Sequence, residues 1–154
     1  MTPNESYMRL MKASEYGIHG VLYLAMQPKG KITLLDEVAE AQNISKSYLS
    51  KIFQTYTKIG ILKSYRGAHK GFALAKPPEK ITLKELIESF EGKFFADECL
   101  LGRGDCPRNG KCTVSAKWRE AVKAMNMILE STTLEQLRDN LENSSNTDNF
   151  KENL

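Results

Sequence analysis

The sequence predicts a mainly α-helical fold with one small β-hairpin, and three observations support this prediction. Apolar residues recur three and four positions apart, the spacing of amphipathic helices, through most of the chain. Two short runs typical of strands, Ile61–Tyr65 and Gly71–Ala75, flank a glycine-containing turn. An apolar stripe between Trp118 and Leu129 predicts the longest helix, over about 113–130. The 154 residues suffice for one domain, or for one small domain with an appendage.

Two helices are expected in the N-terminal part of the chain. The first runs from about Met11 to Met26 and is ended by Gln27-Pro28-Lys29-Gly30. The second opens at Thr33, because Asp36 three positions later completes a pattern typical of a helix cap. The residues expected to face inward are Tyr16, Val21, Leu24, Ala25, Leu35, Val38 and Ala39.

A third helix follows after a three-residue turn. Ser45 is a favourable N-cap, and the helix is expected to continue to about Lys58, before Gly60. Its apolar stripe consists of Leu49, Ile52, Phe53 and Tyr56, which leaves Ser47, Tyr48, Lys51 and Gln54 facing away from the core. Two helices joined by a tight turn and followed by a hairpin form a winged helix-turn-helix. After the hairpin, Thr82 with Glu85 predicts the cap of another helix, to about Phe90.

The chemistry of this unit predicts contact with double-stranded DNA. In a helix-turn-helix the second helix lies in the major groove, with its N-terminal residues nearest the base edges. The segment 46–80 is rich in Lys and Arg, and the hairpin tip is narrow and basic. For any single lysine a solvated surface position is an alternative, but the order of elements together with the basic tip favours DNA. The candidate contacts are Ser45, Ser47, Tyr48 and Lys51 on the helix, and Arg66, Gly67, His69 and Lys70 at the hairpin tip.

Composition narrows the remaining function classes. The net charge of +3 is mild and does not by itself indicate a nucleic-acid partner. There is no glycine-rich phosphate loop and no nucleophile with a plausible base, so an enzyme is not expected. No segment resembles a signal peptide or a membrane span, and we therefore expect a cytoplasmic protein without a membrane partner.

The three cysteines of the chain, Cys99, Cys106 and Cys112, lie in one short polar segment rich in Gly and Pro. Because three is an odd number, the chain cannot pair all of them in internal disulfides. In the cytoplasm thiols stay reduced, which favours metal ligation. The segment is therefore a candidate metal site, and three unrelated free thiols are the alternative.

Several short motifs occur together in this chain, over about residues 8–142. They are Met8-Arg9-Leu10, Tyr23-Leu24-Ala25, Ile44-Ser45-Lys46-Ser47-Tyr48-Leu49, Arg66-Gly67, Gly71-Phe72, the cysteine segment, Trp118-Arg119 and Thr133-Leu134-Glu135-Gln136-Leu137. With these motifs the sequence resembles the IscR/NsrR-type family of iron–sulfur winged-helix transcription regulators. The combination is specific, although no single motif is.

The resemblance implies an iron–sulfur cluster, either 2Fe-2S or 4Fe-4S. Cys99, Cys106 and Cys112 stand where the cluster thiolates of the family stand. In such proteins the first helix of the partner subunit often supplies a further ligand, and the matching positions here hold Glu15 and His19. Ser115 replaces a histidine ligand of the cluster-assembly branch, so this chain departs from that branch at its diagnostic site.

The resemblance also implies a homodimer formed through the long helix. The stripe that would face the partner consists of Trp118, Ala121, Val122, Met125, Ile128 and Leu129; part of it is also expected to pack inside the chain. The expected organisation is a flexible N-terminus (1–7), a winged helix-turn-helix domain (8–92), a cysteine cluster-binding loop (93–112), a dimerisation helix with a short terminal helix (113–142) and a disordered tail (143–154).

The predicted function is a cluster-sensing DNA-binding regulator, mostly a repressor, that responds to nitric oxide, oxygen, redox state or iron. One alternative keeps DNA binding but replaces the cluster with zinc or a thiol switch. Another, of a different class, is an electron-transfer or cluster-carrier protein. The basic hairpin argues against the carrier, since it would have no role there.

Overall fold

The computed structural model describes residues 10–93, 108 and 111–151, with side chains described as far as Ser144. The elements, in chain order, are α1 (Lys12–Met26), α2 (Leu35–Gln42), α3 (Lys46–Lys58), β1 (Leu62–Tyr65), a 3₁₀ turn η1 (Gly67–His69), β2 (Gly71–Leu74), η2 (Pro78–Lys80), α4 (Leu83–Glu91), α5 (Thr113–Ser131) and α6 (Leu134–Lys151). This arrangement confirms the mainly helical, winged helix-turn-helix fold class.

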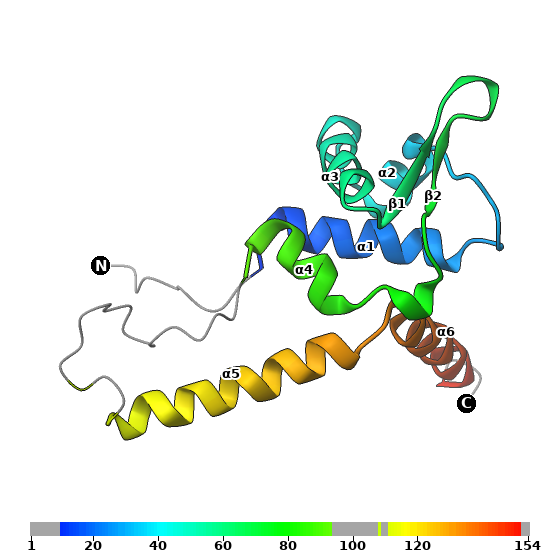
Figure 1. Cartoon of the computed structure of the whole chain (residues 1–154). Helices are drawn as coiled ribbons and strands as arrows, with labels where there is room; N and C mark the ends of the chain where they lie inside the picture. The colour runs from blue at the N-terminus through cyan, green and yellow to red at the C-terminus, as the bar shows by residue number, and fades with distance from the viewer. Residues whose placement is uncertain (1–9, 94–107, 109–110, 152–154) are drawn as a thin grey trace, which may run out of the picture.

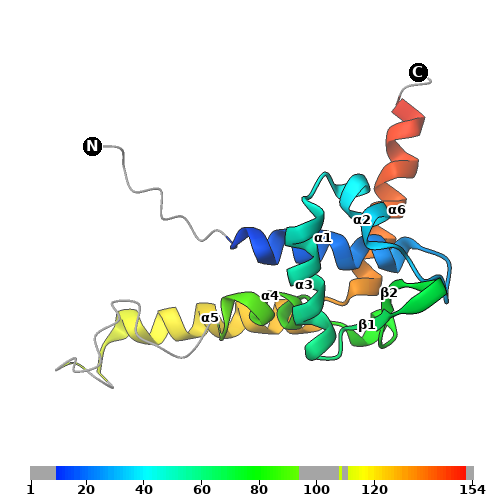
Figure 2. The ribbon, with the colours of Figure 1, turned by 90° about the horizontal axis from the view of Figure 1, so that it is seen from above.

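Helix α3 crosses α1, and the core lies between them (Figures 1 and 2). The stripe predicted for α3 is buried: Leu49, Phe53 and Tyr56 are fully buried and Ile52 is 2% exposed. Burial of each large apolar side chain contributes about 1.5–3 kcal/mol relative to exposure. The apolar stripe of α3 thus fixes which of its faces remains open to solvent.

Two predicted helix caps are confirmed. The Ser45 hydroxyl accepts a hydrogen bond from the Tyr48 backbone N–H at 3.2 Å, and the Thr82 hydroxyl accepts one from Glu85 N–H at 3.1 Å. Such caps satisfy backbone donors that the first turn of a helix leaves without partners.

Thr33 was predicted to cap the second helix, and this prediction is wrong. Helix α2 begins at Leu35 after Leu34, without a side-chain cap. The backbone of Thr33 instead pairs with Phe72, donating to its carbonyl at 2.9 Å and accepting from its N–H at 2.8 Å. Thr33 therefore extends the β1–β2 hairpin on the β2 side. This residue pairs with β2 and does not cap α2.

The hairpin itself matches the prediction to within one residue at each strand. Strands β1 and β2 are antiparallel, with Leu62 opposite Leu74 and Tyr65 opposite Gly71. Leu62 packs into the core at 1% exposure, which anchors the base of the wing.

Backbone hydrogen bonds join the segment between α5 and α6 to the body, and α6 also packs on α1. Leu134 is fully buried and its N–H donates to Ile81 O at 2.8 Å, while Leu83 N–H donates to Thr132 O at 2.8 Å. From there α5 packs on α4 and extends beyond the body in both views (Figures 1 and 2). In the described part of the chain, no helix combines the length and apolar character needed to cross a membrane.

The structure differs from the predicted short terminal helix and disordered tail. Helix α6 continues to Lys151, about ten residues past the expected end near Leu141, and its last turns leave the body (Figure 2). The chain has no Gly or Pro after Gly110, so no residue interrupts the helical backbone there. The polar composition of residues 143–154 predicted disorder, but polar residues do not by themselves end a helix.

Candidate nucleic-acid interface and cysteine site

The open face of α3 carries the polar residues predicted to contact DNA. Ser45, Ser47, Tyr48 and Lys51 are all exposed at or near its N-terminal end. The Ser45 hydroxyl also lies 3.2 Å from that of Ser47, so it serves the cap and a side-chain contact at once. The exposed N-terminal end of α3 therefore offers hydroxyl groups and a cation together.

The wing carries the second group of predicted contacts. Arg66 and the turn Gly67–His69 are exposed, as is Lys70. Gly67 has φ of +83°, a left-handed conformation that glycine adopts without strain. The segment 41–78 contains no Asp or Glu, so α3 and the wing present basic side chains without acidic neighbours in sequence. Figure 1 shows both elements on the same side of α1.

Contacts from α1 and α2 hold α3 in place. The Tyr16 and Tyr48 rings meet edge to face, with centroids 5.9 Å apart, and Lys46 forms an ion pair with Asp36 at 2.6 Å. At the other end of α3 the Tyr56 hydroxyl donates to Leu86 O at 3.2 Å, and burial raises the pKa of that phenol. Tyr56 thus stays neutral and acts as a hydrogen-bonded core residue.

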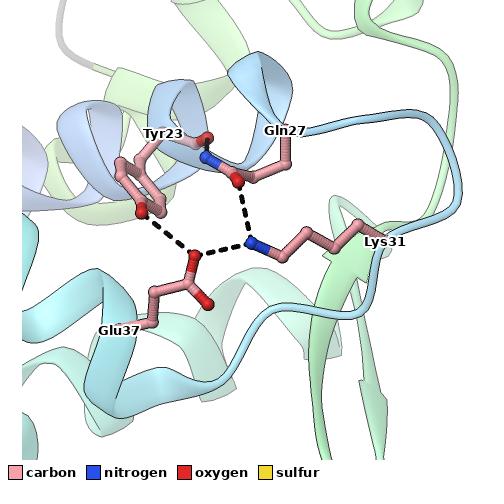
Figure 3. Close-up of polar contacts among 4 residues, drawn as sticks. All are labelled: Tyr23, Gln27, Lys31 and Glu37. Carbon is pink, nitrogen blue, oxygen red and sulfur yellow. Dashed lines mark hydrogen bonds and ion pairs between the residues drawn. The ribbon is translucent and has the colours of Figure 1, made fainter.

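A polar network fixes the connection between α1 and α2 (Figure 3). The Glu37 carboxylate accepts hydrogen bonds from Lys31 at 2.7 Å and from the Tyr23 hydroxyl at 3.1 Å. Lys31 also donates to Gln27, whose amide donates to the Tyr23 carbonyl. The hydrogen bond from Lys31 holds the pKa of Glu37 below its usual value, whereas burial, with the nearby carboxylate, raises the pKa of Tyr23. The network joins the end of α1 to α2 across the loop that leads into the helix-turn-helix.

The candidate metal ligands lie in separate parts of the described structure. Cys112 is a half-buried free thiol that directly precedes α5, while Glu15 and His19 are exposed one turn apart on α1. Cys99 and Cys106 lie outside the described residues. Within the described ranges, no three His, Cys, Asp or Glu side chains gather into a metal-binding group.

The stripe predicted for dimerisation is only partly covered by this chain. Val122 is buried at 3% exposure, and Trp118, Met125 and Leu129 are half-buried. Ala121 is exposed and Ile128 is 64% exposed. The intramolecular packing of α5 on α4 therefore accounts for one edge of the stripe and leaves the other edge open.

The family model for Rrf2, described as an iron-dependent transcriptional regulator, matches residues 10–140. The chain belongs to the Rrf2 family. The match covers the winged helix-turn-helix, the cysteine segment, α5 and the start of α6.

Several Rrf2-like relatives are transcription regulators. The HTH-type transcriptional regulator NsrR of Halalkalibacterium halodurans is 32% identical over 134 residues, which cover 86% of this chain and 92% of that protein. The regulator IscR of Escherichia coli is 31% identical over 135 residues, covering 88% of this chain and 83% of that protein. This Rrf2 chain is accordingly a transcriptional regulator and not an enzyme.

Solved structures support the same assignment. CymR, the global cysteine regulator of B. subtilis, aligns with a TM-score of 0.72 at 28% identity, covering 86% of this chain and 98% of that one. T. potens IscR aligns with a TM-score of 0.71 at 25% identity, covering 89% and 90%. The predicted resemblance to IscR and NsrR is confirmed at the level of the family.

Sequence reasoning missed three residues that position the Rrf2 site. Gly17 and Gly20 let α1 approach α3 closely, and their spacing within an apolar helix was the available signal. Glu91 at the end of α4 accepts hydrogen bonds from Ser14 Oγ and Met11 N–H, both at 2.6 Å. No local pattern could have revealed this contact, because its partners lie about eighty residues apart.

Proposed function

We propose that this Rrf2 regulator binds a near-palindromic DNA operator as a homodimer and that an iron–sulfur cluster at the cysteine segment controls this binding. The observation that carries the proposal is the position of the cysteines. All three fall within residues 99–112, and Cys112 directly precedes the helix proposed to pair with a second protomer.

The chemistry of the described donors fits such a cluster. Thiolates are the usual protein ligands of iron–sulfur clusters. Cys112 is a free thiol that directly precedes α5. Glu15 and His19 are exposed, so α1 of one protomer can present a harder ligand to the cysteines of another.

In this proposal, different residues of the chain have different roles. The three cysteines hold the cluster, and Glu15 or His19 from a second protomer completes its ligand set. When bound, the cluster supplies an iron centre that reacts with nitric oxide or oxygen, or changes redox state. A ligand on α1 would tie that helix to the cluster, and a shift of α1 would carry α3 with it because the two helices are packed together. The spacing of two recognition helices changes, and with it operator affinity.

In this proposal the regulator acts in the cytoplasm, mainly as a repressor. Ser45, Ser47, Tyr48 and Lys51 contact base edges and phosphates in the major groove, and the wing tip contacts the backbone or the minor groove. The absence of acidic residues from 41–78 supports this assignment, because like charges near the phosphates would oppose binding.

The direct test is purification without oxygen, followed by visible absorption with iron and sulfide analysis. A coloured protein with matched iron and sulfide is expected, and Cys106→Ser should lose the colour and the regulated binding together. A Cys106→Ser variant that keeps both would refute cluster control. The same measurements of colour and regulated binding on Glu15→Gln and His19→Ala test the ligand on α1. The control variant is Glu40→Gln, which removes an exposed carboxylate from α2.

A thiol switch or a zinc site is the second candidate. The similarity to CymR, a cysteine regulator, supports it, as does the free thiol of Cys112. A colourless protein that carries zinc would favour the zinc site. One that stays metal-free after reconstitution, and whose operator affinity changes on mild thiol oxidation, would favour the switch.

A further inference from the structure

The contact between Tyr16 and Tyr48 joins the two functional parts of the molecule. The ring centroids are 5.9 Å apart and the ring planes lie at 85°, an edge-to-face arrangement. Tyr48 belongs to the exposed N-terminal end of α3, with 36% of its surface accessible. Tyr16 belongs to α1, next to Glu15 and one turn before His19.

The backbone of Tyr48 is already fixed, so the contact with Tyr16 bears mainly on its side chain. The Tyr48 N–H donates to the Ser45 cap at 3.2 Å, and neighbouring Lys46 is paired with Asp36. The position of the Tyr48 ring over the DNA-facing end of α3 therefore depends on what packs beside it. Among the described residues, Tyr16 provides the ring contact on that side.

Helix α1 cannot shift against α3 without disturbing this contact. A Cβ at Gly17 would lie 2.5 Å from the Tyr56 hydroxyl, and one at Gly20 would lie 2.8 Å from the Phe53 ring. The two helices are thus packed more closely than a side chain at either position would allow. A displacement of the first turns of α1 would therefore push directly on the side chains of α3. Such a displacement would begin at Glu15 or His19, and Tyr16 lies between these two residues in sequence.

We propose that Tyr16 is a positioning residue that holds the Tyr48 ring for operator recognition and links the ligand positions Glu15 and His19 to that recognition. The inference rests on the proposed function, which supplies the operator and the ligand role of α1. Tyr16 acts through Tyr48 and does not itself contact DNA.

A double-mutant cycle tests the first half of the proposal. The probe is a DNA duplex selected by the wild-type protein from a random-sequence library, and full-length Tyr16→Leu, Tyr48→Leu and the double variant are measured without metal by fluorescence anisotropy. Tyr16→Leu should weaken binding about threefold to tenfold, the range expected for an aromatic pair, and Tyr16→Phe should restore it. In the double variant the effect of Tyr16→Leu should nearly vanish. Fully additive losses would overturn the proposal.

The link to α1 is tested by comparing affinities with and without the cluster. The ratio of the two affinities should fall toward one in Tyr16→Leu but stay at the wild-type value in Lys70→Ala, which removes an exposed cation from the wing and weakens binding by another route. An unchanged ratio in Tyr16→Leu would overturn the link. A colourless wild-type protein would refute cluster control, yet the metal-free cycle would still decide the role of Tyr16.

One further measurement needs neither DNA nor cluster. In protein labelled with fluorotyrosine, the Tyr48 resonance, assigned with Tyr48→Phe, should shift in Tyr16→Leu and return in Tyr16→Phe. A resonance that does not move while the thermal unfolding midpoint stays the same would show that Tyr16 does not hold the Tyr48 ring, and would overturn the proposal.

Discussion

At the scale of single residues, Gly17 and Gly20 determine how closely α1 and α3 pack. Below Gly17 lies the Tyr56 ring, which is fully buried and tethered by its hydroxyl to Leu86 O. Because that tether and the contact with Phe90 restrain the ring, it has little freedom to move away from an added methyl group.

Gly17→Ala should therefore destabilise the protein, against the usual effect of this change in a helix. In an exposed helix, replacing Gly with Ala stabilises by about 1 kcal/mol. Here the new Cβ would meet the Tyr56 hydroxyl at 2.5 Å, and we expect a net loss of about 1–3 kcal/mol in the free energy of unfolding. Urea unfolding of the two proteins measures the difference, and an increase in stability would contradict the packing described here.

At the scale of elements, the wing is held at its base and open at its tip. Leu62 anchors β1 in the core, and the Thr33–Phe72 pairing secures β2. Arg66 and Lys70 at the tip are exposed, so they can be changed without removing buried contacts.

Arg66→Ala is expected to abolish sequence-specific binding and to leave the cluster spectrum unchanged. Loss of a phosphate or minor-groove contact by this guanidinium should also lower the dependence of log affinity on log salt by about one ion. Lys123→Ala removes one exposed cation from α5 and is the matched control. Binding to a selected and to a scrambled duplex over a salt series provides the measurement. Loss of the cluster spectrum in Arg66→Ala would mean that the wing is structural.

The elements also show which features could be predicted from sequence. Ser45 and Thr82 were identified as caps because a cap is a local pattern, and the stripe of α3 was found because its period is regular. Thr33 was misassigned because its partner, Phe72, is distant in sequence and its cap-like spacing to Asp36 was coincidental. The hydrogen bonds from Met11 and Ser14 to Glu91 escaped detection for the same reason. The cysteines were identified by residue type, and Glu15 and His19 by the family resemblance, but no local pattern gives the separation of these groups in space.

At the scale of the whole molecule, α5 is a long helix in which Val122 is the one residue that this chain buries. It reaches beyond the body (Figure 1), and its Val114, Met127 and Ile128 are 62%, 62% and 64% exposed. Exposed apolar residues along one helix favour burial against a partner. A second copy of α5 would cover the open edge of the stripe and would bring two winged helix-turn-helix units into one assembly, as a near-palindromic operator requires.

Ile128→Glu should convert the proposed dimer to a monomer. A carboxylate on the pairing face would have to be buried without a partner, which costs far more than an exposed charge. Lys123→Glu adds the same group to α5 outside the stripe and should leave the dimer intact. Sedimentation equilibrium distinguishes the two states, and circular dichroism checks that both variants stay folded. Because each half-site would then be bound alone, operator affinity of Ile128→Glu should fall steeply, while nonspecific binding per chain should change little. A variant that stays dimeric would place the interface elsewhere on the chain.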